Sequence, residues 1–288
     1  MTVRIVTDST ADIPAQAVAD LGITVVPQGL MFGDEELRDG VDITSEEFFR
    51  RLQREDVMPT TTQAAPGAFR AAYESLIAEG ATAIVSCHVS RPLSGTLESA
   101  RQGADGLGVP ILIVDSRQVS LGLGVGVIEA AKAARDGATA EQVQAVAEDV
   151  FRRTHFFFTL ETLEYLRRGG RMSRGQELFG SLLKVKPILE IKDGEVAGVG
   201  RIRTKQKAIE DILGRVAALR PWQYAIATYA TTPEEADYVS DRFRGFSEDT
   251  PVLLNRLTPT VGVHTGPGGL GIGCVMAPDK DSPPFLPE

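Results

Sequence analysis

The sequence has few of the residues that mark an extracellular, membrane-spanning or metal-binding protein. It contains two cysteines, Cys87 and Cys274, and three histidines in 288 residues. So few cysteines, each beside apolar strand-like residues, favour reduced, buried thiols over a disulfide, and His88 and His155 beside strand runs are interpreted as structural. No apolar run approaches the ~18 residues that span a bilayer, and residues 1–6 run into a strand pattern without a signal peptide. These absences predict a cytoplasmic protein with no stable membrane insertion.

An excess of positive charge is also missing. The formal net charge is −9 at pH 7, which argues against nucleic acid or an anionic membrane surface as the main partner. The charge is uneven, because residues 152–207 hold 13 Lys and Arg against 6 Asp and Glu, a local +7, and the rest of the chain carries −16. This predicts a basic face on an acidic body. Its two dense stretches, 167–174 and 201–207, either face solvent or dock an anionic group.

Signatures of several enzyme classes are missing as well. There is no P-loop, no G-x-S-x-G nucleophile elbow and no His/Cys cluster with metal-ligand spacing. Residues 266–271 match G-x-G-x-x-G in form, but the dinucleotide fingerprint must follow a strand and open a helix. Here the glycines precede the apolar run Ile272–Met276, so the match predicts no dinucleotide site.

What the sequence does contain is three uncharged segments rich in hydroxyls or glycine. They are 59–63 (PTTTQ), 93–96 (LSGT) and 264–271 (HTGPGGLG). Hydroxyls and exposed backbone N–H groups hold an oxyanion without reacting with it. Each segment has a plain alternative: a polar loop, a helix N-cap, and a structural histidine with a tight turn. Together they favour a binder of an acidic headgroup over a catalyst.

The order of helix and strand signals indicates an α/β protein of two domains, since 288 residues are long for one. Repeated strand–helix units predict a three-layer domain with a doubly wound parallel sheet over residues 1–152. Residues 153–288 mix hairpins with helices and predict a mixed-sheet α/β domain. Asp193-Gly194 predicts a type I′ hairpin turn in it, and a loose tail is expected from about residue 278.

Local signals predict individual elements and their relation to a site. The apolar run Ile23–Leu30 predicts a single strand. Thr44, and Thr139 with Gln142, belong to capping boxes that each open a helix. Polar residues that follow predicted strands are expected to converge on one cleft, because ligands of open α/β sheets bind beyond the carboxyl ends of the strands.

The motifs, taken in order, resemble the DegV family over essentially the whole chain. The matching segments are 7–12 (TDSTAD), 59–63, 93–96, 163–173 (LEYLRRGGRMS), 186–189 (KPIL), 201–207 (RIRTKQK) and 264–268 (HTGPG). Thr62 stands where the family often has serine, and Ala64 where proline is common, which leaves the row of hydroxyls intact. So many motifs in one order make the resemblance specific.

The resemblance implies a two-domain, non-enzymatic protein that buries a long-chain fatty acid between its domains. It implies that the carboxylate is presented to a separate ATP-dependent fatty acid kinase subunit, which forms acyl phosphate. By motif match, the residues that hold the carboxylate are Thr60, Thr61, Ser94, Gly95, His264 and Thr265. The arginines matched for docking of the partner or of phosphate are Arg171, Arg201 and Arg203. No cofactor, metal or catalytic residue is implied in this chain.

Two other function classes stay open. One is a stand-alone kinase-like transferase on a small acidic or carbonyl substrate, because the implied fold resembles the dihydroxyacetone kinase substrate domain; His264 would then have a covalent or base role. The other is a serine hydrolase that uses Ser94 and His264. The missing P-loop and acidic metal cluster count against the first, and the missing nucleophile elbow and acid partner against the second.

Overall fold

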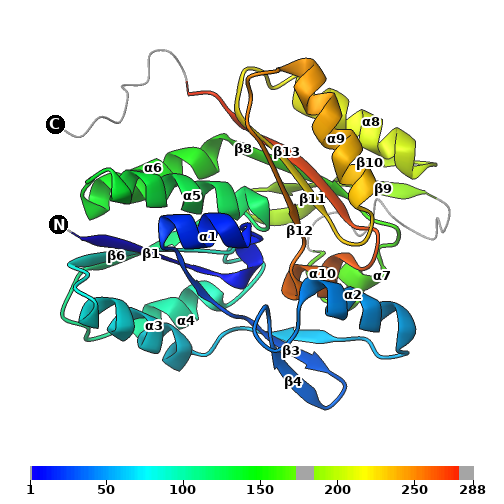
Figure 1. Cartoon of the computed structure of the whole chain (residues 1–288). Coiled ribbons are helices and arrows are strands. Elements are labelled where there is room, and N and C mark those ends of the chain that lie inside the picture. The colour runs from blue at the N-terminus through cyan, green and yellow to red at the C-terminus, as the bar shows by residue number, and fades with distance from the viewer. Residues whose placement is uncertain (1, 173–184, 279–288) are drawn as a thin grey trace.

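The computed structural model describes residues 2–172 and 185–278. It has the two-domain α/β fold expected from the sequence, with a parallel sheet, a mixed sheet and a small antiparallel sheet (Figure 1). α6 (Ala140–Arg153) ends where β8 (Thr154–Thr159), the first strand of the mixed sheet, begins. The predicted division at residues 152 and 153 stays a prediction. Arg174 and nearly all of the tail expected from residue 278 lie outside the described residues.

The parallel sheet has four strands in the order β2, β1, β6, β7. Their bounds are β1 (Val3–Asp8), β2 (Thr24–Val26), β6 (Ala83–His88) and β7 (Ile111–Asp115). One face is covered by α3 (Pro66–Ala78) and α4 (Thr96–Ala104), and the other by α1 (Ala15–Leu21), α5 (Leu121–Arg135) and α6 (Figure 1). Successive side chains of β1 point to opposite faces of the sheet and belong to different hydrophobic cores. Ile5 packs with α5 and α6, whereas Val6 packs with α3. The three expected layers are therefore present.

The small antiparallel sheet interrupts this pattern. Its order is β4 (Glu35–Arg38), β3 (Gly29–Phe32) and β5 (Thr60–Thr62). The prediction of one strand at Ile23–Leu30 is wrong, because the chain leaves the parallel sheet after β2 and Pro27-Gln28 separates β2 from β3. The three threonines form a strand rather than a loop, as suits their branched side chains.

In the described residues, the mixed sheet has six strands in the order β10, β9, β8, β13, β11, β12. The further bounds are β9 (Lys186–Lys192), β10 (Glu195–Ile202), β11 (Trp222–Tyr229), β12 (Val252–Arg256) and β13 (Leu270–Met276). β11 and β12 are parallel, and the other neighbours are antiparallel. Asp193 and Gly194 join β9 to β10 with φ of 55° and 82°, which confirms the predicted turn with two left-handed residues. α8 (Lys205–Ala217) and α9 (Pro233–Phe246) cover its outer face (Figure 1).

No periodicity in the sequence predicts α5, because Gly122, Gly124 and Gly126 alternate with apolar residues. The helix is buried between the parallel sheet and the mixed sheet, and its residues share core clusters with both. A Cβ at Gly126 would collide with the Phe151 ring of α6, and one at Gly124 with the Ala11 carbonyl. Close packing on both sides therefore explains glycines that helix propensity disfavours.

The two predicted capping boxes differ in the structure. At α6, the Thr139 hydroxyl accepts the Gln142 N–H and the Gln142 side chain accepts the Thr139 N–H, so the box is complete. At α2 (Ser45–Arg54), the Thr44 hydroxyl accepts the Glu47 N–H at 3.2 Å. The Glu47 carboxylate pairs with Arg50 instead of the Thr44 backbone, so only half of that box forms.

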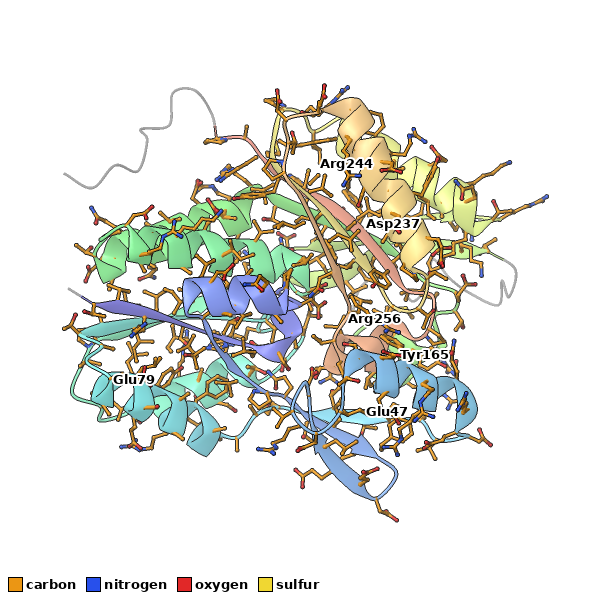
Figure 2. The ribbon with its side chains drawn as sticks, viewed as in Figure 1. Glu47, Glu79, Tyr165, Asp237, Arg244 and Arg256 are labelled. Carbon is orange, nitrogen blue, oxygen red and sulfur yellow. The ribbon has the colours of Figure 1, made fainter. Side chains whose placement is uncertain are left out.

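Three short helices lie where these parts of the fold meet. They are η1 (Ser9–Ala11), α7 (Glu164–Arg168) and α10 (Pro259–Thr265). Val261 of α10 packs with Phe48 and Phe49 of α2, so α10 joins the small sheet to the mixed-sheet domain. Figure 2 shows Tyr165 and Arg256 beside α10, and the Arg256 guanidinium lies 5.5 Å from the centre of the Phe49 ring.

Both cysteines are free and buried, Cys87 on β6 and Cys274 on β13. Burial raises the pKa of each thiol to about 12. Both thiols therefore stay protonated and unreactive at neutral pH, in agreement with the prediction of reduced, buried cysteines.

Candidate functional site

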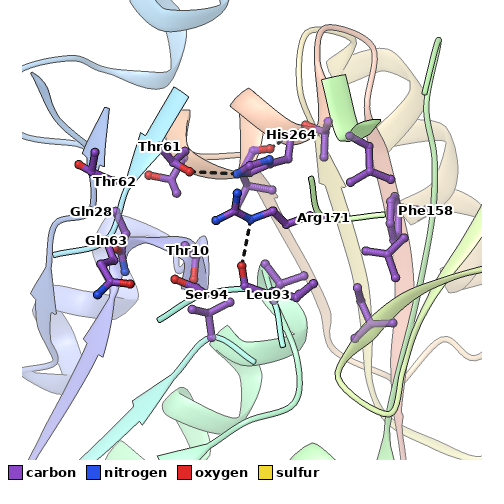
Figure 3. Close-up of a pocket in the computed structure, with 18 residues that line it drawn as sticks. Thr10, Gln28, Thr61, Thr62, Gln63, Leu93, Ser94, Phe158, Arg171 and His264 are labelled. Atoms are coloured by element: carbon purple, nitrogen blue, oxygen red, sulfur yellow. Dashed lines mark hydrogen bonds between the residues drawn. The ribbon is translucent and has the colours of Figure 1, made fainter. Parts of the chain in front are cut away.

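A cavity of about 230 Å³ lies where the parallel sheet, the small sheet and the mixed sheet meet. Its wall includes loops that follow β1 and β6, as the convergence of polar strand ends predicts, together with β5, β9, β10 and α10. Hydroxyl and amide side chains line one side and Phe158 lies on the other (Figure 3). Residues 115 and 116, which also follow a predicted strand, are not part of the wall.

The polar side of the cavity is built around His264 and Arg171. The Thr61 hydroxyl lies 3.2 Å from His264 Nε2, although the two residues are 203 positions apart. Arg171 Nε donates to the Leu93 carbonyl at 3.1 Å, and a terminal nitrogen donates to the Gly169 carbonyl at 2.6 Å. Arg171 thus spans from the neighbourhood of His264 to the loop that carries Ser94 (Figure 3). Among the described residues of the wall, Arg171 is the one with a permanent charge.

The imidazole of His264 is neutral at physiological pH. Burial, and then the nearby Arg171 guanidinium, lower the pKa of His264 to about 4. A neutral imidazole has one N–H donor and one acceptor nitrogen. Nδ1 is buried and has no hydrogen-bond partner within residues 2–172 and 185–278, and a Cβ at Gly169 would collide with the ring. Glycine at position 169 therefore leaves the space that the His264 side chain occupies.

The glycines that follow His264 have a structural reason. Gly266 and Gly268 have φ of 67° and 73°, a region that side chains with a Cβ rarely adopt. A Cβ at Gly266 would also collide with the Tyr165 ring of α7. The tight turn therefore brings β13 back directly after α10 and fixes the end of the helix that carries His264.

The remaining matched residues differ in their placement. Ser94 lines the cavity, and its hydroxyl lies 2.8 Å from the Thr96 hydroxyl. Gly95 lies outside the wall, because the Gln63 side chain occupies the space where its Cβ would be. Thr265 lines the cavity, although its hydroxyl donates to the Val261 carbonyl at 3.1 Å.

The threonines of β5 do not all point to the same face of the strand. Thr61 is half-buried and lines the cavity, whereas Thr60 is exposed and lies outside the wall. Successive side chains of a strand point to opposite faces, so Thr60 and Thr61 do not share one face. Thr62, the last residue of β5, is exposed and also lines the cavity.

The three arginines matched for docking also separate. Arg171 lines the cavity, whereas Arg201 on β10 and Arg203 just beyond it are exposed and outside the wall. Gly169-Gly170 turns the chain after α7 and returns Arg171 to the loop of Leu93. The sequence alone does not predict this difference between the arginines, because Arg171 and Leu93 are 78 positions apart.

Sequence reasoning missed Gln28 at this site. The side chain is 2% exposed and lines the cavity. Its Nε2 donates to the Thr96 hydroxyl at 3.0 Å, and its Oε1 accepts the Ala64 N–H at 2.8 Å. Gln28 thus ties the end of β5 to the start of α4. The sequence signal that could have identified it is the proline and glutamine that interrupt the apolar run starting at Ile23.

Part of the predicted basic excess is neutralised by carboxylates from outside residues 152–207. Arg152 and Arg153 both pair with Asp149 of α6, and Lys205 pairs with Glu235 of α9 at 2.6 Å. These two carboxylates reduce the positive charge that a partner would meet. The basic face is therefore weaker than the composition of this segment suggests.

The apolar side continues into a second, smaller cavity of about 40 Å³. Val119, Phe158 and Val261 line both cavities. Val119 also packs against three separate core clusters. The apolar wall is thus continuous from the Leu93 loop towards the centre of the protein.

The geometry does not assemble a hydrolase from Ser94 and His264. The Ser94 hydroxyl pairs with Thr96 and His264 Nε2 with Thr61, so neither serves the other as nucleophile and base. The distances of a catalytic triad do occur elsewhere: Ser86 Oγ lies 2.7 Å from His88 Nε2, and His88 Nδ1 lies 3.0 Å from Asp8 Oδ2.

The Ser86, His88 and Asp8 side chains have a structural role. Asp8, Ser86 and His88 are all 0% exposed, and the Ser86 hydroxyl also bonds the buried Tyr73 hydroxyl at 2.9 Å. A substrate has no path to such a serine. Within residues 2–172 and 185–278, no group of three or more His, Cys, Asp or Glu is arranged to hold a metal ion. The helices described in those same ranges are too short or too polar to cross a bilayer.

Comparison with known proteins agrees with this architecture. A family model described as "Uncharacterised protein, DegV family" matches residues 2–277. A DegV domain-containing protein of Streptomyces coelicolor is 37% identical over 274 residues, which cover 94% of this chain and 97% of the relative. A DegV domain-containing protein of Deinococcus radiodurans is 33% identical over 281 residues, with 94% and 98% coverage.

Solved structures show the same fold. A fatty-acid-binding DegV family protein from Thermus thermophilus superimposes with a TM-score of 0.87 at 34% identity, over 96% of this chain and 99% of that one. DegV of Bacillus subtilis, described as a fatty acid binding protein, gives a TM-score of 0.87 at 29% identity with the same coverage. With the two-domain fold, the ordered motifs and these matches together, the chain belongs to the DegV family.

Proposed function

We propose that this protein binds a long-chain fatty acid in the cavity between its domains. The main support is the lining of this cavity, which is polar on one side and apolar on the other. The polar side has a guanidinium, a neutral imidazole and hydroxyls, and the other side is a continuous apolar surface. This is the pattern that an amphiphile with a single acidic group requires. The ligand described for the Thermus thermophilus and Bacillus subtilis relatives supports the same class of ligand.

The polar side suits a carboxylate that is held without reaction. Arg171 supplies the opposing charge, and the hydroxyls of Thr61 and Ser94 and the imidazole of His264 supply hydrogen bonds. A neutral His264 can donate to the carboxylate without adding charge. Thr60 and the Gly95 N–H, which the family motifs also suggest, lie outside the wall, so we assign the main contacts to the other residues.

The acyl chain supplies most of the affinity. A C16 chain has about fifteen methylene-scale groups, each worth ~0.8 kcal/mol on burial, or about 12 kcal/mol before costs. Each hydrogen bond to the charged headgroup adds ~1.5–3 kcal/mol before desolvation. The apolar wall therefore decides whether the ligand binds, and the polar side decides how the carboxylate is placed.

We further propose that the chain is a non-enzymatic, cytoplasmic subunit that presents the carboxylate to a separate ATP-dependent fatty acid kinase. The motif match supports this role, and the sequence has no P-loop of its own. Arg201 and Arg203 are exposed and are our candidates for the docking surface. A partner kinase needs the carboxylate in one fixed pose, which the arrangement of Arg171 and His264 favours.

The first test is the lipid content of the protein. Purified from a bacterial host, the protein should carry about one fatty acid per chain, and delipidated protein should take up oleate or palmitate. Organic extraction followed by mass spectrometry measures the first, and titration calorimetry the second. Recovery of no stoichiometric lipid, together with no uptake of either acid, would contradict the proposal.

The second test separates binding from presentation. Ser94→Ala should weaken oleate binding only about tenfold, because one hydrogen bond is lost. It should slow acyl phosphate formation by about 100-fold with ATP and a bacterial fatty acid kinase subunit, because the carboxylate loses its fixed position. The exposed Ser75→Ala on α3 is the matched control. Normal binding and normal turnover in Ser94→Ala would remove Ser94 from the headgroup site.

A further inference from the structure

A second large cavity, of about 250 Å³, lies apart from the fatty-acid cavity and shares none of its lining residues. Its titratable lining residues are three aspartates, Asp8, Asp12 and Asp39, which are 0%, 1% and 2% exposed. Asp8 has a buried partner in His88 at 3.0 Å. Among the described residues, Asp12 and Asp39 have no such partner in their hydrogen bonds, and both instead bind the start of α10.

Asp12 connects three elements. Its Oδ1 accepts the Thr258 N–H at 2.8 Å, directly before α10. Its Oδ2 accepts the Ser120 hydroxyl at the start of α5, and its carbonyl accepts Asn255 Nδ2 at 2.7 Å from β12. The residue has a left-handed backbone, with φ of 50°. Asp12 therefore holds the loop after η1 against two elements of the mixed-sheet domain and against α5.

Asp39 makes the second connection to α10. Its Oδ2 accepts the Thr260 N–H at 3.1 Å and the Ser9 hydroxyl at 2.8 Å. Its Oδ1 is buried without a hydrogen-bond partner in the part of the chain that the structure describes, as are the Thr258 and Thr260 hydroxyls. Ser9 in turn accepts the N–H of Gln28, which lines the fatty-acid cavity, at 3.1 Å. Within the described ranges, uncharged groups alone therefore make the hydrogen bonds that hold this carboxyl in the interior.

These contacts act on the position of His264. α10 has seven residues: its first turn is held by Asp12 and Asp39, and its last turn carries His264. A helix this short moves as one body, so a shift of Thr258 and Thr260 changes the distance of 3.2 Å between His264 Nε2 and Thr61. The two aspartates are thus positioning residues that act through α10.

We propose that Asp12 and Asp39 form a proton-sensitive clamp between the domains, which sets the position of α10 and therefore of His264 at the headgroup site. The effect on ligand rests on the proposed fatty-acid function, whereas the clamp itself is a property of the lipid-free chain.

The direction of the proton effect follows from burial. Burial raises the pKa of Asp12 to about 7 and of Asp39 to about 6, against hydrogen bonds from the Ser120 hydroxyl and the Thr260 N–H that act in the opposite direction. The charge of Asp39 adds to the rise at Asp12. Both pKa values exceed the ordinary 3.8. At a pH between the ordinary value and these raised values, the two carboxyls are therefore protonated in the clamped state and would lose their protons if they were exposed to solvent. The clamp is therefore strongest at acid pH and weakens as pH rises through 6 and 7.

Hydrogen exchange of α10 tests the clamp without any lipid. In the wild type, protection of the amides of residues 258 and 260–265, corrected for intrinsic exchange rates, should fall about tenfold between about pH 5.5 and about pH 8. In the double variant Asp12→Asn/Asp39→Asn the profile should be flat, and protection near pH 8 should match that of the wild type at acid pH. Asparagine keeps an oxygen acceptor and tolerates the left-handed backbone at position 12. Asp42→Asn is the matched control and should behave as wild type, because Asp42 lies in the same loop as Asp39 but forms an exposed ion pair with Arg38.

The release rate of oleate provides the second readout. The wild type should release oleate several-fold faster near pH 8 than near pH 5.5, and the double variant should show a smaller pH effect than the wild type. A flat exchange profile in the wild type, or an unchanged profile in the double variant with a wild-type melting temperature, would overturn the clamp. If the exchange profiles are as expected but the wild type takes up no oleate, the clamp stands and the fatty-acid function fails.

Discussion

Replacing Val119 by tryptophan should reduce the affinity for oleate or palmitate by about 100-fold while the protein stays folded. Val119 faces the cavity that holds the proposed acyl chain and the smaller cavity beyond it. An indole ring placed there takes the room of about four methylenes, which at ~0.8 kcal/mol each is about 3 kcal/mol of lost burial, or roughly two orders of magnitude in Kd. Titration of delipidated protein with oleate measures the effect.

The controls separate blockage from misfolding. Val57 is 37% exposed, so Val57→Trp carries the same change on the surface and should bind as the wild type does. Because Val119 borders existing space, its tryptophan variant should lose no more than the roughly 1–3 kcal/mol that an enlarged core side chain typically costs, and it should stay folded in the lipid-free state. Wild-type affinity in a folded Val119→Trp protein would mean that the acyl chain does not run along this wall.

The second large effect is expected on stability, from His88→Leu. Burial alone would raise the pKa of Asp8, but the hydrogen bond and charge of His88, with hydrogen bonds from Thr10 and Val89, hold it below the ordinary 3.8. Removal of one partner from a buried pair leaves an uncompensated charge and costs about 3–5 kcal/mol. We expect that loss in the free energy of unfolding of lipid-free protein at neutral pH, measured by urea titration.

The pH dependence identifies Asp8 as the cause. A lowered native pKa stabilises the wild type above the ordinary pKa of Asp8, and this stabilisation is lost as pH falls through the native value. In His88→Leu, the unpaired Asp8 is costly when charged and ceases to be so once protonated. The difference between the two proteins should therefore be largest near neutral pH and shrink below about pH 4.

A second histidine provides the comparison. His155 is one-third exposed and lies 4.0 Å from Glu190, so His155→Leu should change the free energy of unfolding by less than about 1 kcal/mol. A loss in His88→Leu as small as that, or one that does not depend on pH, would show that the Asp8–His88 pair does not carry the stability assigned to it.

Local signals in the sequence are enough to predict much of this fold. The alternation of strands and helices, the turn at Asp193-Gly194 and the cap at Thr139 depend on residues within a few positions of one another, and all are present. α5 could not be predicted in this way. Its alternating glycines have low helix propensity, and the packing that requires them comes from Phe151 and Ala11, which are distant in sequence.

The candidate site shows the same division. The motifs predict that Ser94, Thr61 and His264 belong to one site, and all three line the cavity. Their geometry depends on contacts across more than two hundred residues, such as that of Thr61 with His264. The placement of Arg171 inside the cavity, and of Thr60 outside it, depends on a turn and a strand face that no local pattern specified.

The order of strands in the mixed sheet has a consequence for how the chain folds during synthesis. β13 follows α10 in sequence but lies between β8 and β11 in the sheet. A nascent chain that has emerged as far as β12 therefore holds two separate sheet fragments with unpaired edges, which are prone to wrong pairing. The parallel sheet has all its strands by residue 115 and can form much earlier. The ligand cavity, which needs α10 in place, is completed only when the ribosome has delivered the strand that joins the two fragments.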